Sequence, residues 1–423
     1  NQTMDTKISA SLSDTIDYSL TTKKQSYFRH QKVVQNTGSE QVVIGASQQV
    51  TTFEIPVIAL NLGKSFLNFR QSVTAQGGGQ FAHIYRHTVP WSRLELYTRS
   101  GVYLCDLNNA AEAVLALGQR TKKIEEFHGS FEDILTRTSM NDLKVRAEEI
   151  SLDNTADTVE WRIQFKELYE TALSLDKTLN FGEVLNLRIT WKEAPAHGYQ
   201  SDSVVEQGGT KTALGGDITI SNLALYIAGE SNPDVVSALR ETVMSGNMPP
   251  VIIPYTFVYK TNINNQTSHS ISTRFSRGHG RTLVKVMTLF NSGTETVDSR
   301  YDADLDPAEF KSFYSLLNSR RTTEFDIQVA DGVADYQWMR SEAHKDLVVS
   351  LSPDNNQDYF AWEDDWSGSN QASVKQEVSG LPLNDEIKYD LYIQCDGNQT
   401  KNYYTIGVCQ RMLQITPAGV VVG

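Results

Sequence analysis

Several kinds of residue are scarce in this sequence, and each scarcity excludes a class of protein. The three cysteines, Cys105, Cys395 and Cys409, are an odd and small number, which argues against a disulfide framework and favours assembly inside a cell. No apolar run approaches the roughly 20 residues that cross a bilayer, and the first residues lack the basic-then-apolar order of a signal peptide. Basic residues number 38 against 51 acidic ones, giving a net charge of −13. This charge argues against a general or sequence-specific nucleic-acid binder, because phosphate contacts need a basic face.

Motifs of known catalytic sites are also missing. The sequence has no Gly-x-Ser-x-Gly, no phosphate loop, no dinucleotide fingerprint and no Cys–His signature. His83 and His87 have the i, i+4 spacing of zinc-protease ligands, but the glutamate that would act as general base is absent between them. We therefore interpret both as ordinary surface or core histidines, and we expect no catalytic residues, no cofactor, no bound metal and no enzyme activity.

Three alternating aspartates, Asp302, Asp304 and Asp306, resemble the opening of a calcium loop. Pro307 stands where such a loop needs its glycine, and Phe313 stands where it needs the bidentate glutamate. Carboxylates are stabilised at the positive end of a helix dipole. We therefore predict that these aspartates precede a helix rather than bind calcium.

Two further polar patterns have a structural and a functional interpretation. Arg274, Arg277, His279 and Arg281 form the densest basic stretch; a solvated strand face is preferred, and contact with phosphate or an acidic neighbour is the alternative. The tripeptide Asn-Gln-Thr begins at residues 1, 265 and 398. It is formally a glycosylation acceptor, which has meaning only if the chain enters a secretory compartment.

An acidic trio between two tryptophans, in the stretch 360–366, resembles the composition of a sugar-binding cleft. Aromatic faces stack on pyranose rings, and paired carboxylates carry out acid–base chemistry on the glycosidic bond. Trp362 and Trp366 would supply the stacking, and Glu363, Asp364 and Asp365 the chemistry. A β-sandwich that binds or cleaves carbohydrate is thus one alternative function.

Most of the chain has the pattern of β-strands. Apolar residues alternate with polar ones in 53–57, 66–69, 159–165 and 185–191, a hairpin is expected to turn at Ser100–Gly101, and strands recur in 252–259, 271–275, 283–290, 325–329, 389–395 and 403–414. Helical spacing occurs in 107–118 and, after Asp306, in 306–321. The charged stretch 119–155 is expected to be a helical or loop insertion, and the polar stretches 193–217 and 352–380 are expected to be loops over the surface.

Residues 221–246 mark the boundary between two similar halves. Leu223, Leu225 and Ile227 alternate as in a half-buried strand, and Asn232 then offers an N-cap to a helix that begins at Pro233. Because the chain is too long for one core, we predict four regions: an N-terminal arm (1–50), a first β-domain (51–232), a helical linker (233–250) and a second β-domain (251–423). The arm is either mobile or a strand completed by a neighbour. The linker helix is expected to pack between the two domains.

The order of these elements resembles the double jelly-roll major capsid proteins of icosahedral DNA viruses, the lineage of tectiviruses, adenoviruses and large algal viruses. Three stretches carry the resemblance: Ile55–Phe69 followed by Trp91–Tyr97, Leu223–Ile227 followed by the helix from Pro233, and the expected helix Asp306–Arg321 followed by Phe325–Gly332. The resemblance covers residues from about 50 onward and lies in order and spacing.

This resemblance implies an all-β fold of two eight-stranded antiparallel jelly rolls side by side, with a few inserted helices. It implies a structural protein that trimerises into pseudo-hexagonal capsomers and tiles an icosahedral virion shell assembled inside a host cell. Its partners would be other copies of itself, neighbouring capsomers, minor capsid or penton proteins and, through residues 1–50, an internal membrane or membrane protein. Besides a capsid subunit and a β-sandwich that binds or cleaves carbohydrate, a third hypothesis for the function is an elongated adhesin built of β-sandwiches.

Overall fold

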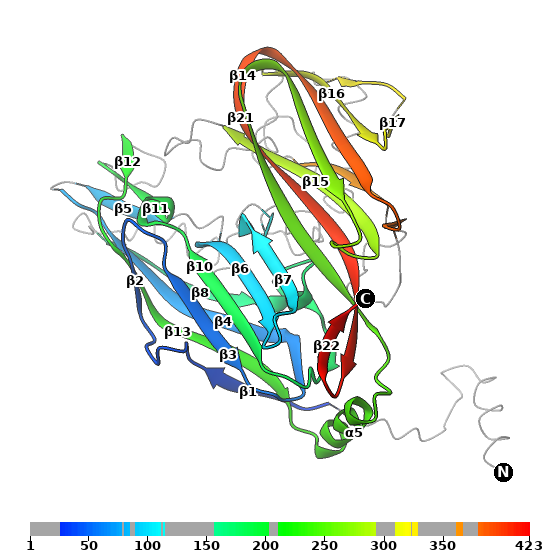
Figure 1. The fold of residues 1–423 in the computed structure, drawn as a ribbon. Coiled ribbons are helices and arrows are strands. Elements are labelled where there is room, and N and C mark those ends of the chain that lie inside the picture. The colour runs from blue at the N-terminus through cyan, green and yellow to red at the C-terminus, as the bar shows by residue number, and fades with distance from the viewer. Residues whose placement is uncertain are drawn as a thin grey trace, which may run out of the picture.

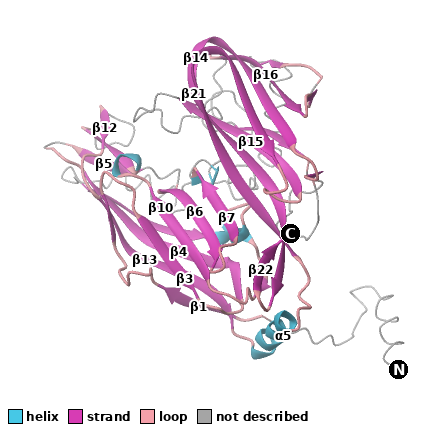
Figure 2. Cartoon of the chain, in the orientation of Figure 1, coloured by secondary structure: helices cyan, strands magenta, loops and turns pink. Residues whose placement is uncertain are grey.

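The computed structural model describes residues 26–77, 80–84, 89–110, 113–114, 156–202, 210–292, 309–322, 324–328, 361–366 and 380–423. Nearly all of the regular structure in these ranges is β-strand (Figure 2). The predicted all-β class is therefore confirmed. The ribbon divides into two sandwiches, which we call the first barrel, formed by strands β1 to β13, and the second barrel, formed by strands β14 to β22 (Figure 1).

Two antiparallel sheets form the first barrel. One has the strand order β1-β13-β4-β8 and the other the order β3-β10-β6-β7. The first sheet contains β1 (Phe28–Val33), β13 (Ile218–Glu230), β4 (Leu60–Thr74) and β8 (Ala156–Gln164), with β2 (Val42–Ile44) and β9 (Thr178–Leu179) at its margins. The second contains β3 (Val50–Ile55), β10 (Leu185–Trp191), β6 (Trp91–Thr98) and β7 (Tyr103–Asn108). The predicted strands at 159–165 and 185–191 and the hairpin at Ser100–Gly101 are confirmed.

A small third sheet stands at one end of the first barrel, in the order β12-β11-β5. It comprises β5 (Phe81–Ile84), β11 (Gly198–Ser201) and β12 (Lys211–Ala213). Short 3-10 turns lie at Phe165–Glu167 (η2), Ala172–Ser174 (η3) and Ala194–Ala196 (η4). The prediction that 193–217 is only a polar surface loop was wrong at this sheet, because Tyr199 and Ser201 are buried on β11, where they pack against β5.

One long ribbon organises the second barrel. β14 (Val251–Phe275) pairs antiparallel with β21 (Ile387–Thr416) along its whole length, with register shifts between Ile263 and Ser268. Beyond the shifts the ribbon bends over (Figure 1), so that each of its strands contributes to two facing sheets. The shorter strands are β15 (Thr282–Ser292), β16 (Phe310–Leu317), β17 (Arg320–Arg321), β18 (Ile327–Gln328), β19 (Ala361–Asp365), β20 (Leu381–Pro382) and β22 (Gly419–Val422).

The two barrels share one strand plan. In the second barrel the last half of β21 lies between the first half of β14 and β15, and β15 pairs in turn with β19. The first half of β21 lies between the last half of β14 and β16. β16 pairs in turn with β17 and β18. These two orders repeat β1-β13-β4-β8 and β3-β10-β6-β7 of the first barrel. Each barrel is thus a jelly roll, as predicted.

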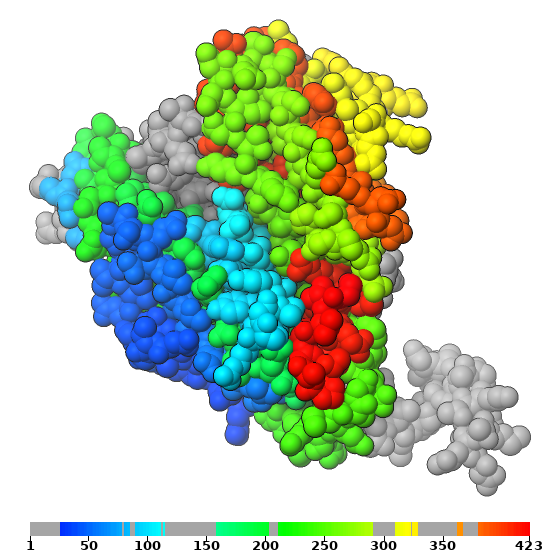
Figure 3. All heavy atoms as spheres, viewed as in Figure 1, coloured from blue at the N-terminus to red at the C-terminus, as the bar shows by residue number. Residues whose placement is uncertain are grey.

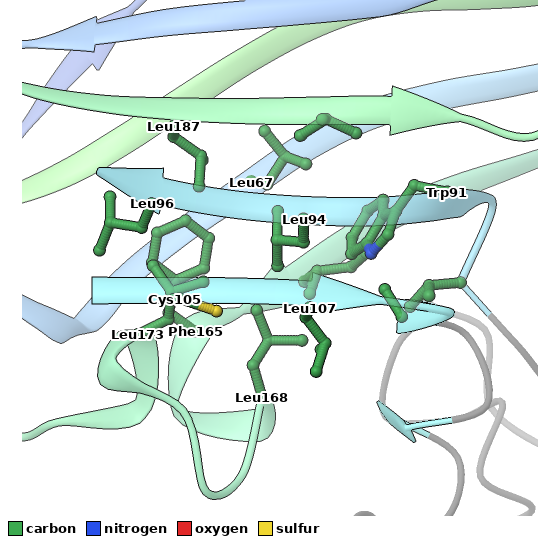
Figure 4. Close-up of a cluster of buried hydrophobic side chains, with 14 of the residues drawn as sticks. Leu67, Trp91, Leu94, Leu96, Cys105, Leu107, Phe165, Leu168, Leu173 and Leu187 are labelled. Atoms are coloured by element: carbon green, nitrogen blue, oxygen red, sulfur yellow. The ribbon is translucent and has the colours of Figure 1, made fainter. Parts of the chain in front are cut away.

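The core of the first barrel continues into the contact between the barrels. Its interior is filled by leucines and aromatics, with Phe165 and Leu173 of the 3-10 turns packed below β7 (Figure 4). The same cluster includes Met287, Ile406 and Val408 of β15 and β21. Residues 401–410 are consequently buried without a break, because this part of β21 has its own barrel on one face and the first barrel on the other. A separate cluster fills the interior of the second barrel.

The predicted helix 306–321 was wrong. Residues 310–317 form strand β16, which pairs with β21, and a register shift between Phe310 and Ser312 marks a bulge. The extra residue lets Phe310 and Phe313 both point into the second core, while Tyr314 stacks outside on Tyr392. The three-residue spacing between Phe310 and Phe313 therefore comes from a bulged strand and not from a helix. The aromatic side chains of this segment are typical of a β-strand. Asp302, Asp304 and Asp306 lie outside the described residues.

The expected N-terminal arm 1–50 was wrong for residues 28–50. Phe28–Val33 pairs with β13 from Phe28↔Glu230 to Val33↔Leu225, and Val42–Ile44 pairs with the other end of β13. The segment is poor in large apolar residues because β1 is an edge strand whose four central residues are all exposed. Residues 1–25 lie outside the described residues.

The predicted helix after Asn232 is confirmed as α5 (Pro233–Met244), and the Asn232 side chain accepts a hydrogen bond from the backbone N–H of Asp234 at 3.0 Å. Its expected place between the barrels was wrong. α5 lies at one end of the molecule (Figure 1), where Val236 and Leu239 are half-buried and Val243 alone among its residues is buried. Of the predicted helix 107–118, Ala110, Ala113 and Val114 are helical and buried, and the loop 119–155 lies outside the described residues.

Candidate functional surfaces

The histidines of the first barrel serve its packing. His83 is buried, stacks on Tyr199 and has its Nε2 atom 3.1 Å from the Ser201 hydroxyl. His87 lies outside the described residues. The described part of the chain contains no group of three or more His, Cys, Asp or Glu side chains placed to hold a metal ion.

A chain of buried hydrogen bonds fixes the state of His197. The Trp161 indole donates to Gln71 Oε1 at 2.8 Å, and Gln71 Nε2 lies 3.0 Å from His197 Nδ1. Because an indole N–H can only donate, the Gln71 amide must present its NH₂ group to His197. His197 Nδ1 therefore accepts, and its Nε2–H donates to the Lys192 carbonyl at 2.9 Å. Burial lowers the pKa of His197 to about 4, so this histidine is a neutral structural group.

The acidic trio 363–365 does not line a sugar cleft. Trp362 is 5% exposed and belongs to the second core, where it meets Phe313 edge-on. Asp364 Oδ2 accepts hydrogen bonds from Tyr389 (2.7 Å), Ser315 (2.8 Å) and Trp362 (3.1 Å). Burial raises the pKa of Asp364 against the opposing effect of these donors. A tryptophan in the core cannot stack on a sugar, so the carbohydrate hypothesis loses its binding surface.

The second core also contains an apolar cavity of about 20 Å³, which has room for about one water molecule. Its lining residues are Thr288, Phe290, Phe310, Phe313, Trp362, Leu391 and Ile393. None of them is more than 7% exposed. Binding sites for small molecules are far larger, on the order of 300–1,000 Å³, so this cavity is a packing defect and not a substrate site.

The basic stretch 274–281 begins at the end of β14 and continues into the following turn, and its side chains make separate contacts. Arg274 is exposed and forms an ion pair with Glu386 at 2.7 Å. His279 packs on Phe257 and has its Nε2 atom 3.0 Å from the Tyr259 hydroxyl, and burial lowers its pKa. Arg281 donates to the Gly423 carbonyl at 3.4 Å. These contacts agree with the preferred interpretation of a strand face and its turn.

Two charged side chains join the barrels. Lys285 of β15 lies 3.2 Å from Glu170, which follows η2 in the first barrel, and both side chains are less than 10% exposed. Burial alone would lower the pKa of Lys285, but attraction by Glu170, Glu363 and Asp365 raises it. Arg411 of β21 stacks on Tyr255 and donates to the Tyr103 carbonyl of β7 at 3.1 Å. The Thr256 hydroxyl also donates to the Glu170 carbonyl at 2.6 Å, and the Val420 N–H donates to the Glu183 carboxylate at 3.0 Å. The contact between the barrels is thus apolar with several polar anchors.

Exposed apolar side chains concentrate near the beginning of the chain. Ten large apolar residues are exposed in the described ranges. Five of them, which define what we call the β1–β3 face, are Tyr27, Val34, Val43, Val50 and Val57. These five residues share one segment of the chain, where they are interspersed with exposed polar residues such as Arg29 and Lys32. Exposed apolar residues mark sites of protein contact when they gather on a surface, so this segment is the candidate interaction surface.

Two of the Asn-Gln-Thr tripeptides meet at the bend of the β14–β21 ribbon. Asn265 and Asn398 are both exposed, and the backbone N–H of Asn265 donates to the Thr400 hydroxyl of the other tripeptide at 3.0 Å.

In the described part of the chain no helix is long and apolar enough to cross a membrane.

No protein-family model matches this chain, and no curated protein matches it in sequence. Solved structures do match it, and the class they define is the viral capsid protein. A chain of the PBCV-1 virus capsid model has a TM-score of 0.56 and 9% identity, covering 96% of this chain and 99% of its own length. The Faustovirus major capsid protein has a TM-score of 0.52 and 8% identity, covering 97% and 94%. A chain of the Sputnik virophage structure has a TM-score of 0.52 and 9% identity, covering 97% and 92%. This chain therefore has the double jelly-roll fold of those proteins.

Proposed function

We propose that this protein is a major capsid protein, which trimerises into pseudo-hexagonal capsomers that tile the icosahedral shell of a virion. The observation that carries this proposal is the pairing of two jelly rolls of one strand plan in a single chain. It is supported by the match of nearly the whole chain to a major capsid protein of Faustovirus and to the PBCV-1 capsid model.

The geometry of such a subunit suits tiling. Each subunit has two similar barrels side by side. Three subunits around one axis therefore place six similar barrels in a ring, which has a near-hexagonal outline. A cyclic trimer of this kind is closed by one type of contact repeated three times. A near-hexagonal base built from one chain can then cover a curved surface with a single kind of capsomer.

The partners follow from this role. Each subunit would contact copies of itself within the trimer and in neighbouring capsomers, and the shell would need minor capsid or penton proteins where six-sided units do not fit. Residues 1–25 precede β1 and are the segment proposed to meet an internal membrane or a minor protein. The proposed role is structural and includes no catalytic step.

The proposed domain division follows the strands. The first barrel begins at β1, the linker occupies 233–250 with α5, and the second barrel occupies 251–423. The carbohydrate-binding function is not retained, because Trp362 lies in the core of the second barrel.

Light scattering during size-exclusion chromatography tests the trimer. The purified protein is expected to elute with three times the mass of the 47.3 kDa chain, and negative-stain electron microscopy is expected to show particles of hexagonal outline. A stable monomer at high concentration, or an elongated particle, would contradict the proposal.

A further inference from the structure

The β1–β3 face lies at the free edge of the first barrel. β1 is at the end of one sheet and β3 at the end of the other. The chain that follows β1 covers part of the outer side of β3, because Gln35 forms a bridge with Phe53 and the Asn36 N–H donates to the Thr52 carbonyl at 2.9 Å. In the described residues no strand pairs with the outer side of β1. The opposite edge of the second sheet is β7, which contacts β14 of the second barrel. Figure 3 shows the N-terminal strands as a continuous blue surface on the side of the molecule away from the second barrel. The outer side of β1 and the part of β3 beyond this bridge are therefore open to another chain.

The charge of this segment differs from that of the whole protein. Residues 26–57 contain two basic residues, Arg29 and Lys32, and two acidic ones, Glu40 and Glu54, so their net charge is zero in a chain of −13. Lys32 and Glu40 also neutralise each other in an ion pair at 2.5 Å. Two copies of an acidic protein repel each other, and the repulsion is weakest where charge is absent. Depletion of charge is also the compositional mark of the centre of protein interfaces.

We propose that the β1–β3 face is the surface through which one copy of this chain contacts the next copy within the trimer. This inference rests on the proposed function. A threefold ring requires head-to-tail contacts, so the β1–β3 face meets a different surface of the next copy. Val43 and Val50, which are 49% and 57% exposed in the single chain, become buried in this contact.

Replacing a valine of this face by glutamate tests the inference, because a carboxylate at an apolar contact must lose its water. The test variants are Val50→Glu and Val43→Glu in the full chain. Val421→Glu is the matched control, since Val421 is also a strand valine and is 56% exposed. We expect the two test variants to shift the trimer toward monomer by at least tenfold in the association constant, and the control to remain trimeric. Circular dichroism melting curves establish that all three variants are folded.

The outcomes separate this inference from the proposed function. A wild-type trimer that persists in folded Val50→Glu and Val43→Glu overturns the inference and leaves the capsid role standing. A wild-type monomer overturns both. Many amides of 28–55 are hydrogen-bonded to β13 or β10 within one chain, so the second measure is the exchange of those amides in 28–55 that donate no hydrogen bond inside the chain. We expect these amides to exchange slowly in the trimer and faster in monomeric Val50→Glu. Equally slow exchange of these amides in both would mean that a segment of the same chain covers the face, which also overturns the inference.

Discussion

The hydrogen bonds of Trp161, Gln71 and His197 allow only one protonation state of the histidine. A second proton on His197 would place an N–H opposite the Gln71 NH₂ group, and turning that amide would leave the Trp161 indole without its acceptor. Burial lowers the pKa of His197 from the ordinary value of about 6.5 to about 4, and the direction agrees with these hydrogen bonds, which fit only the neutral ring. A group of this kind stabilises the folded state fully above the unfolded pKa, and the stabilisation is lost as pH falls toward the folded pKa.

We expect the free energy of unfolding to lose about 3 kcal/mol from this one residue between pH 7 and pH 4, at about 1.4 kcal/mol per unit of pKa. Other groups titrate in the same range, so the measurement is the difference between wild type and His197→Gln in urea unfolding. This difference should be large at pH 7 and should shrink toward pH 4. A difference that does not change with pH would show that His197 does not titrate in this way.

Lys285 gives a second prediction at the residue scale. Lys285→Met leaves the buried Glu170 carboxylate without its cation, and breaking a buried pair in this way costs about 3–5 kcal/mol. The double variant Lys285→Met with Glu170→Gln removes both charges and should recover much of the loss. Urea unfolding measures all three proteins. If the double variant is no more stable than the single one, the pair is not coupled.

Sequence patterns identified few of these roles. Trp362 and Asp364 stand in a long polar stretch. The prediction of a surface loop at 352–380 was wrong for 361–365, because these residues form β19 and pair with β15, and Trp362 lies in the core. Lys285 and Arg411 could not be recognised, since their partners, Glu170 and the Tyr103 carbonyl, lie in the other barrel. Charge pairs far apart in sequence leave no local signal.

At the scale of elements, the sequence predicted correctly those features that depend on contacts within a few residues, such as helix caps and turns. Asn232 and Pro233 determine the start of α5 through contacts inside the first turn, and the Ser100–Gly101 turn is fixed by the left-handed backbone of Gly101 (φ 90°). The prediction of a helix over Phe310–Leu317 was wrong because pairing with β21, and not the local spacing of apolar residues, determines the conformation of this segment. The prediction that α5 lies between the barrels failed because its helical stripe is narrow, with only Val243 buried.

The cap of α5 can be tested directly. Asn232→Ala removes the oxygen that accepts the Asp234 N–H, and loss of such a cap costs about 1 kcal/mol. Asn232→Asp keeps an acceptor oxygen and should retain most of the stability. The midpoint of chemical unfolding measures both variants. Equal stability of Asn232→Ala and wild type would mean that α5 contributes nothing to the measured transition.

At the scale of the whole molecule, the barrels share one apolar cluster. Ile406 is fully buried in this cluster, on the face of β21 that meets the first barrel. Ile406→Ala should therefore destabilise the protein by about 2–5 kcal/mol, and it should do so for both barrels together. Scanning calorimetry should show one transition in wild type and a lower melting temperature in the variant. Val421→Ala, at an exposed position, is the control and should change little.

Two separate transitions in wild type would contradict the shared core. The sequence indicated two similar halves but not their contact, because the buried stretch 401–410 includes Lys401, Asn402, Thr405 and Gln410. A strand buried on both faces is usually continuous in hydrophobicity, and this one is not. Its burial on both faces is explained only by the first barrel, which packs against it.

The β14–β21 ribbon also governs when the protein can fold. Both sheets of the second barrel depend on β21, whose partner β14 is synthesised long before it. The first barrel is complete once β13 has been made, whereas β14 waits with its pairing edge open while the intervening chain is translated. Contacts between distant segments form slowly, since the entropy of closing the loop must be lost before they form. Folding of the second barrel is accordingly the late and aggregation-prone step of biosynthesis. The first barrel is already folded at that point and offers a surface against which the second barrel can fold.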